Sequence, residues 1–194
     1  MSNIVGKKRF VLYAVLIIIA GCTIYLVLLN MFEKSPALED RFDQNVRSSA
    51  IQKPDKALVH LYFADKDNSF LIAEERVLFR SDDPAEFGKT IIESLIRGPQ
   101  KKLMRTIPVE TALRALYVTQ DGTAYVDITE AVKEHHPGGS ESELMTIYSI
   151  VNSLILNIPE IDAVKILIGG RESMTLAGHI DLSSPFKADM LLIR

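Results

Sequence analysis

An uninterrupted apolar run near the start of the chain constrains its structure more than any other feature of the sequence. The run extends from Phe10 to Phe32 and contains 23 residues without a single charge. A helix rises about 1.5 Å per residue, so a helical run of this length would span roughly 34 Å and cross the hydrocarbon core of a bilayer. The sequence therefore predicts a transmembrane helix over residues 10–32.

The charges that flank this run predict its orientation. Three basic residues and no acidic residue precede it, at positions 7–9, whereas Glu33 and Lys34 nearly cancel just beyond it. Positively charged flanks stay on the cytoplasmic side of a membrane. We therefore expect residues 1–9 to form a cytoplasmic tail and residues 33–194 to lie in the periplasm or another extracytoplasmic space, anchored to the cell membrane by a single pass.

Two other fates for the run remain open at this stage. Residues 19–22, Ile-Ala-Gly-Cys, are similar to a bacterial lipobox, in which the cysteine is acylated and becomes the new N-terminus. Cleavage of a secretory signal near the same small residues is the second alternative. The residues after Cys22 stay apolar up to Leu29, which favours an uncleaved anchor, but the sequence does not decide whether Cys22 is lipidated.

Composition limits the remainder of the chain. Residues 33–57 are polar and contain prolines, which is typical of a linker, and residues 58–194 then have the length of one ordinary domain. The single cysteine excludes an intrachain disulfide. All 25 acidic residues but only 19 of the 22 basic ones follow the apolar run, giving this part a formal net charge of −6. That charge argues against nucleic acid as a partner.

Hydrophobic periodicity predicts an α+β domain. Alternating apolar residues predict strands near residues 58–64, 70–79, 112–119, 124–128 and 164–168, with a short edge strand over 174–182. Apolar residues three and four apart predict one helix from the N-cap Asp83 to Gly98 and another from Ser140 to Asn157. Two helices with one apolar face each favour a two-layer sandwich, with both amphipathic helices on one mixed β-sheet.

Two further details of the helices can be predicted. The second helix begins with Ser140 and Glu143, spaced as in a capping box, in which each side chain bonds the backbone of the other residue. The inward helix faces should bury four large aliphatic residues between the helices and the sheet: Ile91, Leu95, Val151 and Leu154.

Several short motifs follow one another at a characteristic spacing. They are Leu61-Tyr62-Phe63, Leu95-Ile96-Arg97-Gly98-Pro99, Ile107-Pro108 with Thr111, Asp121 through Ile128, Gly139-Ser140, and Val164-Lys165-Ile166 through Gly169-Gly170. In this order they resemble the GerMN domain of bacterial envelope proteins, over about residues 58–182. The resemblance implies a ring-building-like α/β fold, membrane tethering, and a role in sporulation, germination or envelope assembly without established catalysis. Germination proteins of this family look like tandem copies, whereas this chain has one.

The residues that could carry chemistry all have simpler structural explanations. His135 and His136 lack the spacing of a metal motif, and Asp127 with Asp181 would be an isolated pair of acids. We therefore assign no catalytic residue, metal site or cofactor. One basic cluster on the acidic domain is a candidate contact surface, and its residues are Lys101, Lys102 and Arg105.

These observations predict a non-enzymatic, membrane-tethered interaction module of the bacterial cell envelope. Its expected partners are the membrane and other envelope proteins, and self-association stays open. A periplasmic ligand-sensing accessory protein is the alternative function, and a cell-wall enzyme is the less favoured one, because a binding pocket leaves little trace in a single sequence.

Overall fold

The computed structural model describes residues 21–28 and 55–194 of the chain. The chain divides into two units, Met1–Lys53 and Pro54–Arg194. Residues 21–28 of the first unit form an exposed helix. In the described ranges, no helix has both the length and the apolar character that a membrane crossing needs. The rest of the expected transmembrane span 10–32, the expected tail 1–9 and the expected linker up to residue 54 lie outside the described residues.

The second unit has the α+β composition that the sequence predicts. Its long strands and helices lie close to the expected positions, and it adds a short helix, α4, and a 3-10 turn that the sequence analysis missed. In chain order the elements are β1 (Lys56–Ala64), β2 (Leu71–Phe79), α3 (Pro84–Arg97), β3 (Leu113–Val118), β4 (Thr123–Ile128), α4 (Ala131–Glu134), α5 (Ser140–Ile155), β5 (Ala163–Ile168) and the turn Met190–Leu192.

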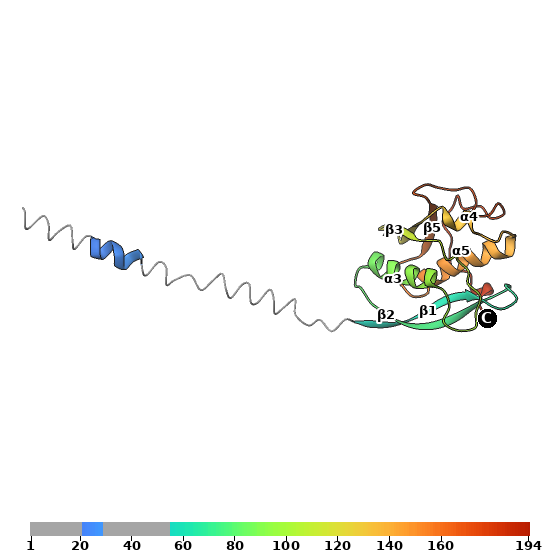
Figure 1. The fold of residues 1–194 in the computed structure, drawn as a ribbon, viewed down its shortest axis with the longest axis horizontal. Helices are drawn as coiled ribbons and strands as arrows, with labels where there is room; N and C mark the ends of the chain where they lie inside the picture. Colours follow the sequence, from blue (N-terminus) through green and yellow to red (C-terminus); the bar gives the residue numbers. More distant parts are fainter. Residues whose placement is uncertain (1–20, 29–54) are drawn as a thin grey trace, which may run out of the picture. The chain divides into compact units, whose positions relative to one another are not determined.

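The strands form two sheets, so the expected two-layer sandwich on a single mixed sheet is wrong. β1 and β2 pair as an antiparallel hairpin, while β3, β4 and β5 form a separate three-stranded sheet. Within the second sheet β3 is antiparallel to β4, and β4 is parallel to β5. Figure 1 shows α3 and α5 lying between the hairpin and the second sheet, and α5 contacts both β1 and β5.

The reason for two sheets lies in helix α5, which is buried around most of its circumference. Polar side chains of α5 and of the segment just after it bond the edge of β1 that faces away from β2. His60 N–H donates to Asn157 Oδ1 at 2.9 Å, and Asn157 Nδ2 returns a bond to His60 O at 2.8 Å. Tyr62 N–H donates to Ser153 Oγ at 3.1 Å. Because these side chains occupy the edge of β1, no strand of the second sheet pairs there, and the prediction of one apolar face on α5 was too simple.

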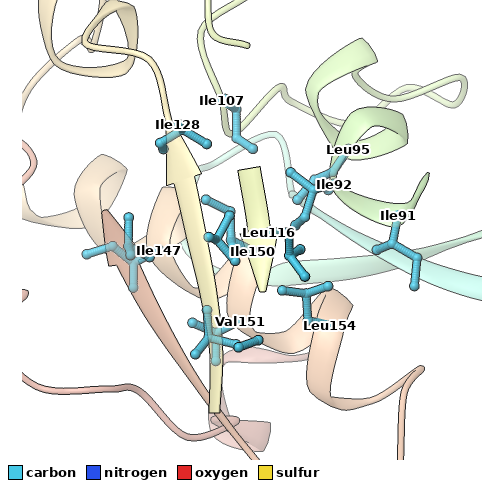
Figure 2. Close-up of a cluster of buried hydrophobic side chains, with 14 of the residues drawn as sticks. Ile91, Ile92, Leu95, Ile107, Leu116, Ile128, Ile147, Ile150, Val151 and Leu154 are labelled. Carbon is cyan, nitrogen blue, oxygen red and sulfur yellow. The ribbon is translucent and has the colours of Figure 1, made fainter. Parts of the chain in front are cut away.

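The hydrophobic core forms where the two helices meet β1 on one side and the second sheet on the other. Ile91 and Leu95 of α3 and Val151 and Leu154 of α5 are at most 1% exposed, which confirms their predicted burial. Figure 2 shows these side chains gathered around Leu116 of β3.

The predicted limits of α3 are also confirmed. The Asp83 carboxylate accepts a bond from Ala85 N–H at 2.9 Å, as an N-cap does. Gly98 ends the helix with a φ of 91°, a left-handed value that favours glycine.

The predicted capping box at the start of α5 does not form. Gly139 is the N-cap residue, and no side chain caps this end of the helix. The Glu143 carboxylate is fully buried and turns to the chain segment after β5. It accepts three backbone N–H bonds there: from Leu176 at 2.9 Å, from Ala177 at 2.8 Å and from His179 at 2.9 Å.

The expected edge strand over 174–182 does not form, and this segment consists of bends and irregular backbone instead. Burial alone would raise the pKa of the Glu143 carboxyl, but the backbone N–H donors outweigh burial and hold the pKa below its ordinary value. The ionised carboxylate therefore contributes stability above the ordinary carboxyl pKa, and this contribution is lost as the pH falls through the lowered value.

We expect Glu143→Gln to lower the free energy of unfolding at pH 7 by about 2 kcal/mol or more, because an amide cannot satisfy three N–H donors. The midpoint of thermal unfolding measures this change, and its difference from the unmodified protein should narrow in acid as the carboxylate is protonated. Glu141→Gln is the matched control, since Glu141 lies exposed in the same helical turn. Equal midpoints for the two variants would contradict the proposed role of Glu143.

Candidate functional site

The candidate contact residues lie on the segment that follows α3, residues 98–105, which we call the basic loop. The loop starts at Gly98, whose N–H donates to Leu95 O at 3.0 Å. Near its other end, Met104 N–H donates at 2.8 Å to the carbonyl oxygen of Ala64, the last residue of β1. Both ends of the basic loop are therefore fixed by backbone bonds to the elements beside it.

Arg105 is used to hold the end of helix α3. Its guanidinium donates to the carbonyl oxygens of Ile96 and Arg97, the second of these at 2.7 Å. These carbonyls have no partner within the helix, and the negative end of the helix dipole favours a cation there. The guanidinium also fills the space that a side chain on Gly98 would occupy. Arg105 thus has a structural role that the sequence analysis did not foresee.

A second buried carboxylate, that of Glu74 on β2, holds the middle of the basic loop. It accepts bonds from Gln100 N–H at 3.0 Å and from Lys101 N–H at 2.7 Å. Arg76 pairs with the same carboxylate and donates to Gly98 O at 3.0 Å. Burial would raise the pKa of Glu74, but the bonds from the loop and from Arg76 outweigh it and lower the pKa. The loop backbone is therefore fixed at three positions, Gly98, Gln100 and Lys101.

The side chains of Lys101 and Lys102 project from this fixed backbone and are exposed. Within residues 55–194, neither ammonium group forms an ion pair with a carboxylate. The structure thus divides the predicted cluster: two lysines face solvent, while Arg105 is bound to α3. A positive pair on a domain of net negative charge remains available for contact.

A cavity of about 310 Å³ adjoins the end of the basic loop. Met104 and Arg105 line it from the loop, and His135 lines it from the segment after α4. His135 Nδ1 lies 3.2 Å from Ala131 O, so this nitrogen carries the proton and donates.

The neighbouring His136 is part of the fold at this place. Its Nδ1 accepts from Gly138 N–H at 3.0 Å, so Nε2 carries the proton and donates to Thr146 Oγ1 at 3.0 Å. Thr146 in turn donates to Thr106 O at 2.5 Å. Burial holds the pKa of His136 below its ordinary value, which keeps the ring neutral near pH 7.

The acids considered from the sequence also have structural partners. Asp127 accepts from Gly170 N–H at 2.8 Å and from Arg114 Nε at 3.0 Å, which fixes the turn after β5. Asp181 accepts from the backbone and the hydroxyl of Ser183, which closes a local turn. In the described part of the chain, no three His, Cys, Asp or Glu residues gather as metal ligands would.

Comparison with known proteins identifies a family to which most of the second unit is similar. Residues 60–173 match the family described as "Germane: Sporulation and spore germination". A comparison with curated proteins gives no significant match.

Several solved structures are similar to this chain, among them the following three. The tandem GerMN domains of the Bacillus subtilis sporulation protein GerM align at a TM-score of 0.53 and 21% identity, over 69% of this chain and 46% of that one. The first GerMN domain of the same protein alone aligns at 0.52 and 20% identity, over 70% and 98%. A candidate lipoprotein of Clostridium perfringens aligns at 0.49 and 24% identity, over 71% and 91%. The chain covers about half of the tandem structure and nearly all of the single domain, so it carries the fold of one GerMN domain.

Proposed function

This chain belongs to the Germane family of sporulation and spore germination domains, and from that premise we propose that it is a membrane-tethered interaction module of the bacterial cell envelope. It acts by contact with other envelope proteins and catalyses no reaction. The observation that carries this proposal is the basic loop, in which Lys101 and Lys102 stand exposed on a backbone that buried groups hold in place.

A fixed backbone favours this use of the loop. Ordering a mobile loop on binding costs conformational entropy, and a loop that is already held by Glu74, Arg76 and Arg105 avoids much of that cost. Exposed ammonium groups speed encounter with an acidic surface and select against basic ones. We infer that the partner presents carboxylates to Lys101 and Lys102.

The tether is the second part of the proposal. The uncharged run over residues 10–32 supports a transmembrane helix, the basic residues at positions 7–9 support a cytoplasmic N-terminus, and residues 21–28 are helical. Residues 33–57 then serve as the linker, and the domain that follows lies outside the cytoplasm. Acylation of Cys22 is the alternative form of the anchor.

The bonds made by the titratable groups favour a contact function over a catalytic one. Each group that could serve as an acid or base, such as His136, Asp127 or Asp181, already bonds a backbone or side-chain partner that fixes the fold. Ligand sensing is the second candidate function, because a cavity of about 310 Å³ lies at the lower end of the range for small-molecule sites.

The orientation can be tested with a reporter enzyme that is active only outside the cytoplasm. We expect such a reporter, fused after Arg194, to be active in the full chain. Deletion of residues 10–32 is the control and should abolish the activity. An inactive reporter on the intact chain, with the fusion present at normal level, would contradict the proposed topology.

The contact surface can be tested by charge reversal. We expect the double change Lys101→Glu and Lys102→Glu to reduce the amount of envelope protein that co-purifies with the full chain from its own membranes by about tenfold, because attraction becomes repulsion. The control is Lys66→Glu with Lys187→Glu, which makes the same change in net charge at two exposed lysines elsewhere. Equal co-purification by the two variants, both with unchanged thermal midpoints, would contradict the proposed surface.

A further inference from the structure

The cavity beside the basic loop is built from segments that are far apart in the chain. Loop residues 104–108 form one wall, and Asn68 of the β1–β2 turn forms another. Pro137 closes the side that follows α4, and Ser142 and Thr146 of α5 complete the lining. Residues that converge on one hollow from four separate segments are typical of a binding site.

One buried hydroxyl in this lining has no partner. Thr106 is only 7% exposed, and its Oγ1 forms no hydrogen bond with any described residue. Buried hydroxyls in folded proteins nearly always have a partner, because an unsatisfied one loses its bonds to water without compensation. Since Thr106 lines the cavity, a molecule bound there could supply the missing partner.

The polar groups around the cavity favour a ligand that carries negative charge. None of the ten lining residues is acidic. Ser142 Oγ accepts a bond from Asn68 Nδ2 at 3.1 Å, which leaves the hydroxyl proton of Ser142 free to donate. Arg105 also lines the cavity, and α3 uses only two of the five N–H groups of its guanidinium.

The start of helix α5 adds to this preference. Ser142 belongs to the first turn of α5, and no side chain caps that end of the helix. The uncapped N–H groups of a first helical turn and the positive end of the helix dipole attract an anion. The orphaned hydroxyl of Thr106 comes from a different segment and is an independent observation at the same cavity.

The remaining lining is apolar and comes from Met104, Ile107, Pro108 and Pro137. A purely inorganic anion would leave this apolar surface uncovered. A molecule that carries an apolar group next to its charge would cover it and gain from its burial.

We propose that this cavity binds a carboxylate joined to a small apolar group, which is the chemistry of a peptide C-terminus with an apolar last residue. Thr106 Oγ1 and Ser142 Oγ donate to the carboxylate, and the apolar lining receives the side chain. The site does not depend on the contact role proposed for Lys101 and Lys102, so either can fail without the other.

The test uses the full chain and isothermal titration with the acetylated tripeptide Ala-Ala-Leu, once with a free C-terminal carboxylate and once as the C-terminal amide. We expect the acid to bind at millimolar concentration or better and the amide to bind at least about tenfold more weakly, because the amide lacks the charge that the donors favour. Absence of binding by the acid, or equal binding of acid and amide, would overturn the proposal.

A matched pair of variants locates the site. Thr106→Val removes the orphaned hydroxyl at nearly constant shape, so it should leave the thermal midpoint unchanged or raised and weaken binding of the acid by about tenfold. Thr111→Val is the control, since Thr111 Oγ1 is equally buried and unpartnered but does not line the cavity. Unchanged binding by a folded Thr106→Val protein, or equal losses in both variants, would overturn the proposal.

A further titration separates the two sources of such a carboxylate, a protein or peptide C-terminus and a small free acid. N-acetyl-leucine carries the same terminal group without the preceding residues. Weaker binding of N-acetyl-leucine than of the tripeptide acid supports a protein or peptide C-terminus as the natural occupant. Equal binding means that the peptide part makes no contribution, and it overturns the peptide assignment in favour of a small free acid.

Discussion

The burial of helix α5 on two sides is the constraint on which the rest of this structure depends. The polar residues on the buried faces of a helix between two sheets cannot reach water, so each must find a partner inside the protein. Asn157 and Ser153 bond the edge of β1, Thr146 bonds the loop at Thr106, and Glu143 bonds the segment after β5. These bonds place the hairpin, the cavity wall and the C-terminal segment around one helix. The two separate sheets follow from the same cause, because side chains of the helix region occupy the strand edge that a single sheet would need.

Buried carboxylates also fix the backbone of the surface that we propose makes contact with a partner. Glu74 is buried on β2 and accepts bonds from the backbone of the basic loop at Gln100 and Lys101, and Glu143 in the same way accepts bonds from the segment after β5. In both places, hydrogen bonds from several N–H donors offset the free-energy cost of burying a charged carboxylate. The result is a loop with exposed lysine ammonium groups on a backbone that has little freedom left to lose on binding.

Much of the local structure could be predicted because it depends on neighbours in sequence. Asp83 and Gly98 bound α3 as their residue types require, and the apolar spacing identified Ile91 and Leu154 as core. The partners of Glu143 lie more than 30 residues away, so its spacing from Ser140 suggested a capping box that does not form. Arg105 was grouped with the lysines for its charge, although its guanidinium closes α3. Glu74 offered a signal that was missed: it faces inward opposite Leu61, at a position where strand alternation predicts an apolar residue.

Native-state hydrogen exchange at the amides of the basic loop tests most directly whether buried side chains hold this surface in place. In the unmodified protein, the account predicts slow exchange at Gln100 and Lys101, because both amides donate to the buried Glu74 carboxylate. In Glu74→Gln, exchange at these two amides should accelerate while Leu176 and Ala177, held by Glu143, stay protected. Fast exchange at Gln100 and Lys101 in the unmodified protein, or unchanged exchange in the variant, would contradict the account.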